Sequence, residues 1–408
     1  MTLRKTLSIM LAALLLVVTG FIGFMTVQRY YRDMGYAFLV TYNRQLSDSP
    51  TVQEQLRARI NAVTSSVNTN MVMKHTLQRL NARIQMAMGK QMLSYGGSTM
   101  VTTATGHLYD LMPDTDATRG VRAQTLNGLR QLNDKLSEKG IPLLYGYAHT
   151  TLYDGESLPD GVTDDNNAVA DEIVASLESY GIRVIDSREI MRESGLPLNE
   201  IIYRTDAHWS VRSAFEMYTH MVDLLNADTS IKADRNAADI ENFDVSYLPK
   251  AHISDIGNRL GADVIAPDDF EIITPKFDTN IRREIMKDKV LVPSDGRFED
   301  VVLEKSMLPE AQGLEYGNCY NYYGQHPDVV YYTNEAAPEG RLLIIKDSFG
   351  TPTSSFMAMA VRDVCAIDLR KTQKTVEDYV ESFKPDVVMF VQCQEVMRGQ
   401  NFVFVDQK

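Results

Sequence analysis

Two short stretches, far apart in the chain, carry side chains that could perform nucleophilic catalysis. Residues 203–210 read YRTDAHWS and contain an aspartate and a histidine, Asp206 and His208, with one residue between them. Residues 342–350 read LLIIKDSFG and contain Ser348. In acyl transfer a carboxylate orients an imidazole, and the imidazole takes the proton of a serine hydroxyl. The residue types therefore suggest transfer of an acyl group through Ser348.

The spacing of Asp206 and His208 fits an oriented imidazole. If residues 206–208 are extended, the two side chains point to the same side. The carboxylate would then accept from one ring nitrogen and leave the other nitrogen to receive the serine proton. The alternative is that both residues only cap or balance the dipole of the helix predicted over 211–226.

Ser348 follows a short apolar run, residues 342–345, which is typical of a strand buried on both faces of a parallel sheet. Thr351 and Pro352 come next and predict a helix start, with threonine as the cap. Ser348 is thus expected on the turn between strand and helix, where open α/β sheets place ligands and present nucleophilic serines. The alternative is a solvent-facing or capping serine, because Ser and Asp favour such turns.

Alternating helices and strands are predicted from residue 94 onward. Helix 122–139 stops at Gly140 and leads into strand 141–147, and helix 167–180 stops at Gly181 and leads into strand 182–186. This rhythm predicts a parallel sheet with helices on both faces. Further strands are expected over 342–345, 363–367 and 387–392, and the less regular interval 231–332 is expected to be an insertion of loops and short strands.

The amino-terminal segment predicts a membrane span. Residues 6–27 contain no charged side chain and are long enough, as a helix, to cross about 30 Å of hydrocarbon. A cleaved signal peptide is the alternative, but no Ala-x-Ala cleavage site follows, so an uncleaved anchor is favoured. Arg4 and Lys5 before the span and Arg29 and Arg32 after it leave the orientation undecided by charge. A single-pass topology with residues 28–408 outside is the simplest reading.

Between the span and the α/β region, apolar residues recur at helical spacing over 47–93. The first helix is expected to start near Ser49 and Pro50, with the polar cluster at 65–70 as an interruption. A stalk or helical hairpin is therefore predicted. A coiled coil between two copies is a weaker alternative, because the heptad pattern fails at Asn70 and Lys74.

Composition excludes several classes of protein. The 41 basic and 54 acidic residues give a net charge of −13, which argues against a nucleic-acid surface. The three cysteines, Cys319, Cys365 and Cys393, form neither a disulfide framework nor a zinc pattern, and we assign them to the core. The histidines show no metal-ligand spacing, so neither a metal nor another cofactor is expected.

The two chemical stretches together resemble a known family. RTDAHW, then LLIIKDSFG, then strands ending in AIDLR and MFVQC, are similar to the DHHW family and the related alginate O-acetyltransferases of the SGNH-hydrolase superfamily. The resemblance extends over 106–397. It implies a flavodoxin-like α/β sheet behind an anchor or signal, with Ser348 as nucleophile, His208 as base and Asp206 as orienting acid. Ala207 stands where the namesake motif has histidine.

A second departure from the family concerns the oxyanion site. Family members carry a Gly-Gly-Asn or similar segment upstream of the serine strand, and the corresponding stretch here is 323–327, YGQHP. Gln325 or His326 could supply the donor, and Tyr323 and Lys346 are further oxyanion or substrate-binding candidates. A missing donor would cost about 10²–10³ in rate. The tyrosines at 316, 320, 322, 323, 331 and 332 could stack on sugar rings, or simply pack in the core.

These observations predict three parts: an anchor at 1–28, a helical stalk or hairpin at 29–94, and an SGNH-like α/β domain at 95–408 with the irregular insertion at 231–332. The leading interpretation is a membrane-anchored, extracytoplasmic O-acetyltransferase or acetylesterase acting on a cell-envelope or exported polysaccharide. Its expected partners are the acylated glycan, the lipid membrane through 6–27 and a membrane protein that delivers acyl groups, with no nucleic acid. A non-catalytic glycan-binding or assembly protein is the alternative, and a partner-docking role for the helical region is a third.

Overall fold

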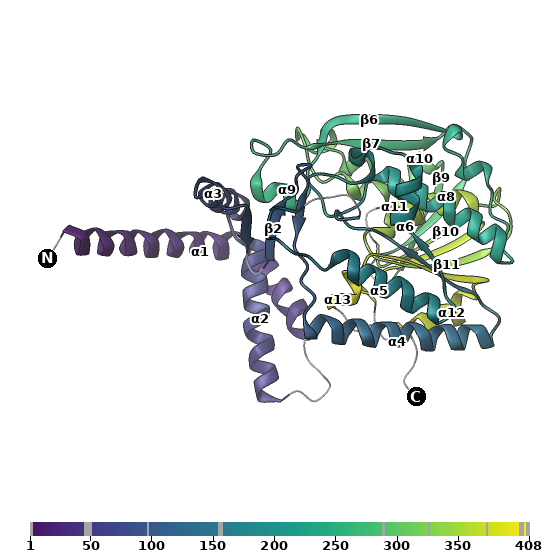
Figure 1. Ribbon diagram of the computed structural model, residues 1–408, viewed down its shortest axis with the longest axis horizontal. Coiled ribbons are helices and arrows are strands. Elements are labelled where there is room, and N and C mark those ends of the chain that lie inside the picture. The colour runs from purple at the N-terminus through teal and green to yellow at the C-terminus, as the bar shows by residue number, and fades with distance from the viewer. Residues whose placement is uncertain are drawn as a thin grey trace. The chain divides into compact units, whose positions relative to one another are not determined.

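A computed structural model describes residues 3–44, 51–95, 98–153, 158–287, 290–324, 327–372, 374–399 and 404. The chain forms two compact units, Met1–Met88 and Gly89–Lys408 (Figure 1). The first unit is helical. The second contains the central sheet and both chemical stretches.

The first unit contains three helices among its described residues: α1 (Leu3–Arg44), α2 (Val52–Asn70) and α3 (Lys74–Ala87). The predicted span 6–27 lies inside α1, and the apolar part Ser8–Leu39 is long and apolar enough to cross a membrane. Helix α1 continues well beyond the predicted span, with one non-helical residue at Tyr30.

Helices α1 and α2 pack together as a hairpin. Thr51 and Glu54 form a reciprocal capping box at the start of α2, and the predicted start at residues 49–50 lies outside the described residues. The polar cluster at 65–70 does not interrupt α2, which runs to Asn70. It is tolerated because part of it faces α1, where Ser66 Oγ donates to the carbonyl of Met34 at 2.6 Å.

The second unit is organised around a mixed sheet that has, among its described residues, eight strands in the order β5-β4-β13-β11-β12-β10-β8-β9. The first five are mutually parallel. They are β4 (Leu143–Tyr147), β5 (Arg183–Asp186), β11 (Arg341–Lys346), β12 (Asp363–Ile367) and β13 (Val387–Gln392). The other three, β8 (Ile281–Lys287), β9 (Val290–Gly296) and β10 (Val329–Thr333), extend the sheet antiparallel beyond β12.

Helices cover both faces of this sheet (Figure 1). On one face, α4 (Asp116–Glu138), α5 (Asn166–Ser179) and α12 (Val376–Phe383) pack against alternate residues such as Leu343 and Ile345. On the other, α6 (Ser187–Ser194), α8 (Val211–Asp228) and α11 (Gly350–Ala360) pack against Leu342 and Ile344. Strand β11 is thus buried on both sides, and the predicted α/β class is confirmed.

The remaining elements lie outside the central sheet and its covering helices. A small antiparallel sheet contains β1 (Met92–Tyr95), β2 (Ser98–Thr102) and β3 (Leu108–Asp110), and a ribbon contains β6 (Phe243–His252) and β7 (Asp268–Pro275). Short helices are α7 (Leu198–Ile201), α9 (Asp255–Leu260), α10 (Phe298–Val301) and α13 (Val396–Gly399), with 3₁₀ turns at Asn236–Ala238, Ile240–Asn242, Lys305–Met307, Glu310–Gln312 and Tyr320–Tyr323. The interval 231–332 therefore supplies three strands of the central sheet as well as loops, because strands added antiparallel to β12 need no helical crossover.

The chain diverges at the carboxyl end of β11. Helix α11 packs on one face of the sheet and leads from β11 to its neighbour β12. Helix α12 packs on the opposite face and leads from β12 to β13, the neighbour of β11 on its other edge. Helices that leave neighbouring strands toward opposite faces open a crevice at that sheet edge, which is where open α/β sheets bind ligands. Ser348 follows β11 at this point.

Candidate active site

The turn that carries Ser348 is held by the carboxylate of Asp347. Oδ1 of Asp347 accepts from the amide of Phe349 at 2.8 Å, and Oδ2 accepts from the amide of Cys393 at 2.8 Å. The second bond ties the turn to the end of β13. Burial raises the pKa of Asp347, although the Cys393 amide acts in the opposite direction. The carboxylate of Asp347 thus stabilises the backbone of the turn.

The helix after this turn starts two residues earlier than predicted, at Gly350 instead of Pro352. Helix α11 begins at Gly350, so Thr351 is not its cap. The hydroxyl of Thr351 instead accepts from Nζ of Lys346 at 3.0 Å, a lysine that is itself buried. The early start is possible because Gly350 has no side chain: a Cβ there would lie 2.7 Å from the carbonyl oxygen of Val391.

Residues 203–210 bend rather than extend, contrary to the expectation for 206–208. The amide of His208 donates back to Oδ1 of Asp206 at 3.2 Å, which brings the two side chains together across the bend. The loop is anchored from β7, because Asp268 accepts from the amide and the hydroxyl of Thr205 at 2.9 and 2.7 Å. The carboxylate reaches the imidazole as predicted, but by a different backbone path.

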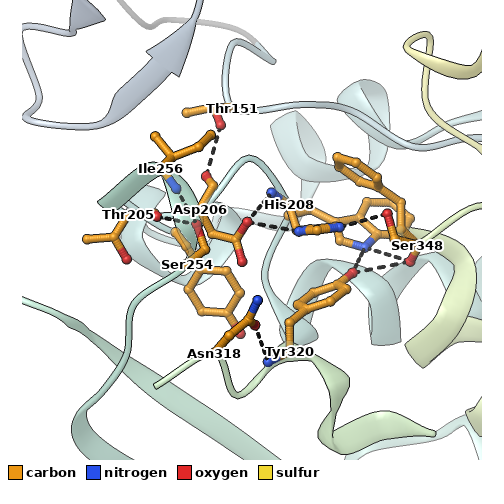
Figure 2. Close-up of polar contacts among 12 residues, drawn as sticks. Thr151, Thr205, Asp206, His208, Ser254, Ile256, Asn318, Tyr320 and Ser348 are labelled. Atoms are coloured by element: carbon orange, nitrogen blue, oxygen red, sulfur yellow. Dashed lines mark hydrogen bonds and ion pairs between the residues drawn. The ribbon is translucent and has the colours of Figure 1, made fainter. Parts of the chain in front are cut away.

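Asp206, His208 and Ser348 form a continuous hydrogen-bonded chain (Figure 2). Asp206 Oδ1 lies 2.8 Å from His208 Nδ1, and His208 Nε2 lies 2.8 Å from Ser348 Oγ. Both distances fall in the range expected of a base, its orienting acid and a nucleophile. The side chain of His208 is 21% exposed and that of Asp206 is 3% exposed, so the chain of bonds runs from the interior to a solvent-accessible serine.

The charges in this group lower the pKa of the Asp206 carboxylate and raise the pKa of the His208 imidazole. Burial alone would raise the pKa of Asp206, but His208 and His252 outweigh burial and hold that pKa well below its usual range. Burial alone would lower the pKa of His208, but the charge and hydrogen bond of Asp206 raise it above its ordinary value. Asp206 therefore stays ionised and stabilises the imidazolium that forms when His208 accepts a proton.

His252 was not singled out by the sequence, yet it completes the site. Its Nε2 lies 2.9 Å from Asp206 Oδ2, and its Nδ1 accepts from the amide of Cys319 at 3.1 Å. Because a backbone amide can only donate, Nδ1 must be the acceptor, and Nε2 carries the proton donated to Asp206. A lone histidine at the end of a strand gives no local signal of this contact, which depends on β6 meeting the 203–210 loop.

An aromatic frame joins the two chemical stretches. The ring of Tyr320 stacks on His208 with centroids 4.2 Å apart, and Phe349 lies against the same imidazole at 4.7 Å. Nε1 of the buried Trp209 donates to the hydroxyl of Tyr320 at 2.9 Å and to the carbonyl of Phe349 at 3.1 Å. Trp209 follows His208 and Phe349 follows Ser348, so the indole links the two stretches next to the contact between His208 and Ser348.

The other two predicted site residues that the structure describes, Tyr323 and Lys346, are buried. Tyr323 is fully buried, and its hydroxyl accepts from the amide of Ile273 at 2.8 Å, so it packs in the core instead of presenting a ring to a sugar. Lys346 is also buried, which lowers its pKa to about 8, and it bonds Thr351 instead of reaching Ser348. Gln325 and His326 lie outside the described residues. Core packing likewise accounts for the buried Tyr320, Tyr322 and Tyr332, while all three cysteines are buried as predicted.

The comparison with protein families is informative at this point. Residues 110–245 match the family model described as the SGNH hydrolase-like domain of the acetyltransferase AlgX. Over residues 110–245 the chain is thus similar to an SGNH hydrolase-like domain. The match covers about a third of the chain and includes Asp206 and His208 but not Ser348, and it favours an enzyme of the O-acetyltransferase class. No curated protein matches the chain in sequence.

Solved structures show the same SGNH-like fold. PatB1 from Bacillus cereus, in a structure with a sulfonyl adduct, is 16% identical with a TM-score of 0.59, and the alignment covers 76% of this chain and 98% of PatB1. A DHHW family protein from Eubacterium siraeum is 13% identical with a TM-score of 0.55, over 76% of this chain and 95% of its own. The resemblance to the DHHW family is thereby confirmed at the level of the fold, and the family match over 110–245 confirms the resemblance to the acetyltransferase AlgX.

Proposed function

We propose that this protein is a membrane-anchored O-acetyltransferase or acetylesterase that uses Ser348 as nucleophile, His208 as general base and Asp206 as orienting acid. One observation carries the proposal: the 2.8 Å contact between His208 Nε2 and Ser348 Oγ, in an imidazole whose other nitrogen is bonded to Asp206. These side chains meet at the carboxyl edge of the parallel strands, although Ser348 lies 140 positions beyond His208 in the sequence.

The proposed reaction has two balanced halves. Ser348 Oγ gives its proton to His208 Nε2 and attacks the acyl carbonyl, and His208 then protonates the departing alcohol as the ester C–O bond breaks. In the second half a sugar hydroxyl or water gives its proton to His208, attacks the acyl-serine and releases Ser348, which recovers its proton from His208. A sugar hydroxyl makes the enzyme a transferase, and water makes it an esterase.

The oxyanion that forms in each half needs hydrogen-bond donors. Within the described part of the chain, the backbone N–H of Ser348 has no acceptor, so we assign it to the oxyanion. The Phe349 amide is already bonded to Asp347 and is not a second donor. Gln325 and His326, which lie outside the described residues, stay our candidates for the second donor, because they occupy the stretch that corresponds to the oxyanion segment of the family.

The substrate class follows from the family match. AlgX is described as an acetyltransferase, so an O-acetyl group on a polysaccharide is the proposed substrate. We place the second unit outside the cell, anchored through residues 6–27, where the glycans of the envelope are available. Since acetyl-CoA is not expected outside the membrane, a transferase would receive its acyl group from a membrane partner.

The test is covalent labelling together with ester hydrolysis, using the full chain in detergent. A fluorophosphonate or a sulfonyl fluoride should modify wild-type protein at Ser348, and p-nitrophenyl acetate should be hydrolysed. Ser348→Ala should abolish both signals. Ser354→Ala is the matched control, because this serine lies in α11, just after the turn that carries Ser348, and its hydroxyl donates to the carbonyl of Thr351 at 2.9 Å. It should keep both signals.

The same experiment also tests the alternative, a glycan-binding protein without catalytic activity. Such a protein would show no hydrolysis above background, no labelling of Ser348 and unchanged glycan affinity in Ser348→Ala. That combination would exclude the enzyme, whereas labelling that is lost only in Ser348→Ala would exclude the binding protein.

A further inference from the structure

Charge is divided sharply between the two units of the chain. Residues 1–88 contain 10 basic and 3 acidic side chains, a net charge of +7, while residues 89–408 contain 31 basic and 51 acidic side chains, a net charge of −20. No acidic residue occurs between Glu54 and Asp110. A strongly basic part of an acidic protein attracts partners of negative charge.

Helix α3 combines this charge with an exposed apolar stripe. Met73, Leu77, Leu80, Ile84 and Met88 recur at three- and four-residue intervals, so they lie along one side of the helix. Leu80 is 54% exposed, Ile84 53% and Met88 70%. The charged residues of this helix are all basic: Lys74, Arg79 and Arg83. A basic amphipathic helix of this kind is typical of segments that lie in a membrane interface.

The contacts within the first unit place α3 beside the proposed membrane span. The amide of Val72, in the turn before α3, donates to Oγ1 of Thr26 at 3.0 Å, and Thr26 lies near the carboxyl end of the uncharged stretch 6–27. Arg29 and Lys74 line the same pocket at this turn. The start of α3 therefore lies at the level where the apolar stretch ends.

We infer that α3 binds the surface of the membrane that residues 6–27 enter, with its apolar stripe among the acyl chains and its basic side chains on anionic headgroups. The inference rests on the membrane anchoring proposed above. The continuity between α3 and the end of the span favours lipid over other occupants, because lipid is already present at that level. The absence of acidic residues over 55–109, which include α3, favours anionic lipid over neutral lipid.

The consequence for function is a second membrane contact beside the anchor. A single apolar helix holds a protein in the bilayer but leaves it free to rotate about the helix axis. A surface-bound α3, joined to Thr26 through Val72 of the preceding turn, would restrict that rotation for the unit 1–88. The lipid contact would thus orient the anchor relative to the membrane plane.

The test uses full-length protein in vesicles of phosphatidylglycerol, with one nitroxide on an introduced cysteine. The three native cysteines are buried, so they should not take the label. The label is placed at Ile84→Cys on the stripe or at Met86→Cys as matched control. Met86 is also apolar and 44% exposed, but it is two residues away and therefore on nearly the opposite side of the helix.

The expected result is a severalfold higher collision rate with oxygen than with a water-soluble nickel complex at Ile84→Cys, and the reverse at Met86→Cys. The ratio of oxygen to nickel collision rates at Ile84→Cys should fall severalfold in phosphatidylcholine vesicles. It should also fall severalfold when Arg79→Gln and Arg83→Gln are combined with Ile84→Cys. Equal nickel access at both sites would overturn the inference. Exclusion of both reagents at Ile84→Cys, or dipolar broadening from a second label, would also overturn it, because protein would then cover the stripe.

A third label separates this inference from the anchoring on which it rests. Leu14→Cys lies within the uncharged stretch and should report a bilayer environment. If Leu14→Cys is bathed in water, the anchor itself fails. If Leu14→Cys is in lipid and Ile84→Cys is not, only the surface contact of α3 fails, and ester hydrolysis by the second unit is unaffected in either case.

Discussion

His252 donates its Nε2–H to Asp206 Oδ2 at 2.9 Å, on the carboxylate oxygen that His208 leaves free. Asp206 is therefore held by two imidazoles, one on each oxygen, and cannot rotate without breaking a buried hydrogen bond. The second imidazole is fully buried, and the Cys319 amide sets its tautomer. We regard His252 as a positioning residue that acts through Asp206 on His208.

Replacing His252 should weaken catalysis more than substrate binding. His252→Ala leaves a buried carboxylate oxygen without its donor, which costs about 1–3 kcal/mol of stability. It also loosens the orientation of His208, so we expect kcat to fall while KM changes little. His252→Gln keeps an N–H that can reach Asp206 and should restore part of kcat. The measurement is steady-state hydrolysis of p-nitrophenyl acetate with thermal unfolding of each variant.

A purely structural role for His252 makes a different prediction. Both variants would then lose melting temperature without a fall in kcat per folded molecule. A double variant with Asp206→Asn distinguishes the two cases as well, because residues acting through one another give non-additive losses in kcat. Additive losses would count against a role through Asp206.

Asp206→Asn tests the orienting acid. Asparagine can accept from the amide of His208 but can stabilise the wrong imidazole tautomer and carries no charge for the imidazolium. The corresponding change in a serine protease costs about 10⁴ in kcat, and we expect a loss of similar order here. Circular dichroism should show a retained fold. Activity within a few fold of wild type would exclude Asp206 from this role.

Activity should decline in acid with a midpoint above the ordinary histidine pKa. The neutral imidazole is the active form of His208, and the charge of Asp206 raises the pKa of His208 above 6.5 despite its burial. As pH falls through that raised pKa, the imidazole becomes protonated and kcat/KM decreases. The pH profile of kcat/KM measures this directly. A flat profile down to pH 5 would rule out His208 as base.

Gly350 should not tolerate a side chain. A Cβ at this position would lie 2.7 Å from the Val391 carbonyl oxygen and 2.9 Å from Cβ of Lys346, so Gly350→Ala must displace the start of α11 and with it Ser348. We expect loss of most activity and a lower melting temperature. Gly120→Ala is the matched control, since a Cβ at Gly120 in α4 meets nothing within 4 Å and should stabilise the helix by about 0.5–1 kcal/mol.

The buried guanidinium of Arg122 should make stability depend on pH. Arg122 donates to both oxygens of Asp114 at 2.8 and 3.0 Å, and this hydrogen bonding holds the pKa of Asp114 well below its usual range. A lowered folded-state pKa contributes stability that is present above the unfolded value, about 3.9, and is lost as pH falls toward the folded value. Arg122→Met should cost about 3–5 kcal/mol at neutral pH, because it leaves the Asp114 carboxylate without its partner.

The control for Arg122 is an exposed arginine of the same helix. Arg130 lies 3.7 Å from Asp134 and both side chains are about half exposed, so Arg130→Met should change stability by less than about 1 kcal/mol. Denaturant unfolding between pH 3 and pH 7 compares the three proteins. If Arg122→Met retains the acid dependence of wild type, the Asp114 contact does not set it.

Local patterns in the sequence determined the architecture. The apolar run at 342–345 predicted β11, and glycine after each of two helices predicted the strands β4 and β5, because burial on one or both faces imposes its own period on the residues. The residue types of Asp206, His208 and Ser348 also predicted which chemistry to look for. These features are encoded by neighbours within a few positions of one another.

The tertiary structure alone decided how those residues meet. The 203–210 loop bends because Asp268 of β7 anchors it, and His252 reaches Asp206 because β6 lies against that loop. Tyr323, a candidate for substrate binding, is buried because its 3₁₀ turn packs under Ile273 and α11. Contacts between residues tens of positions apart depend on how whole elements pack, and a side chain such as His252 carries no local pattern that reveals its partner.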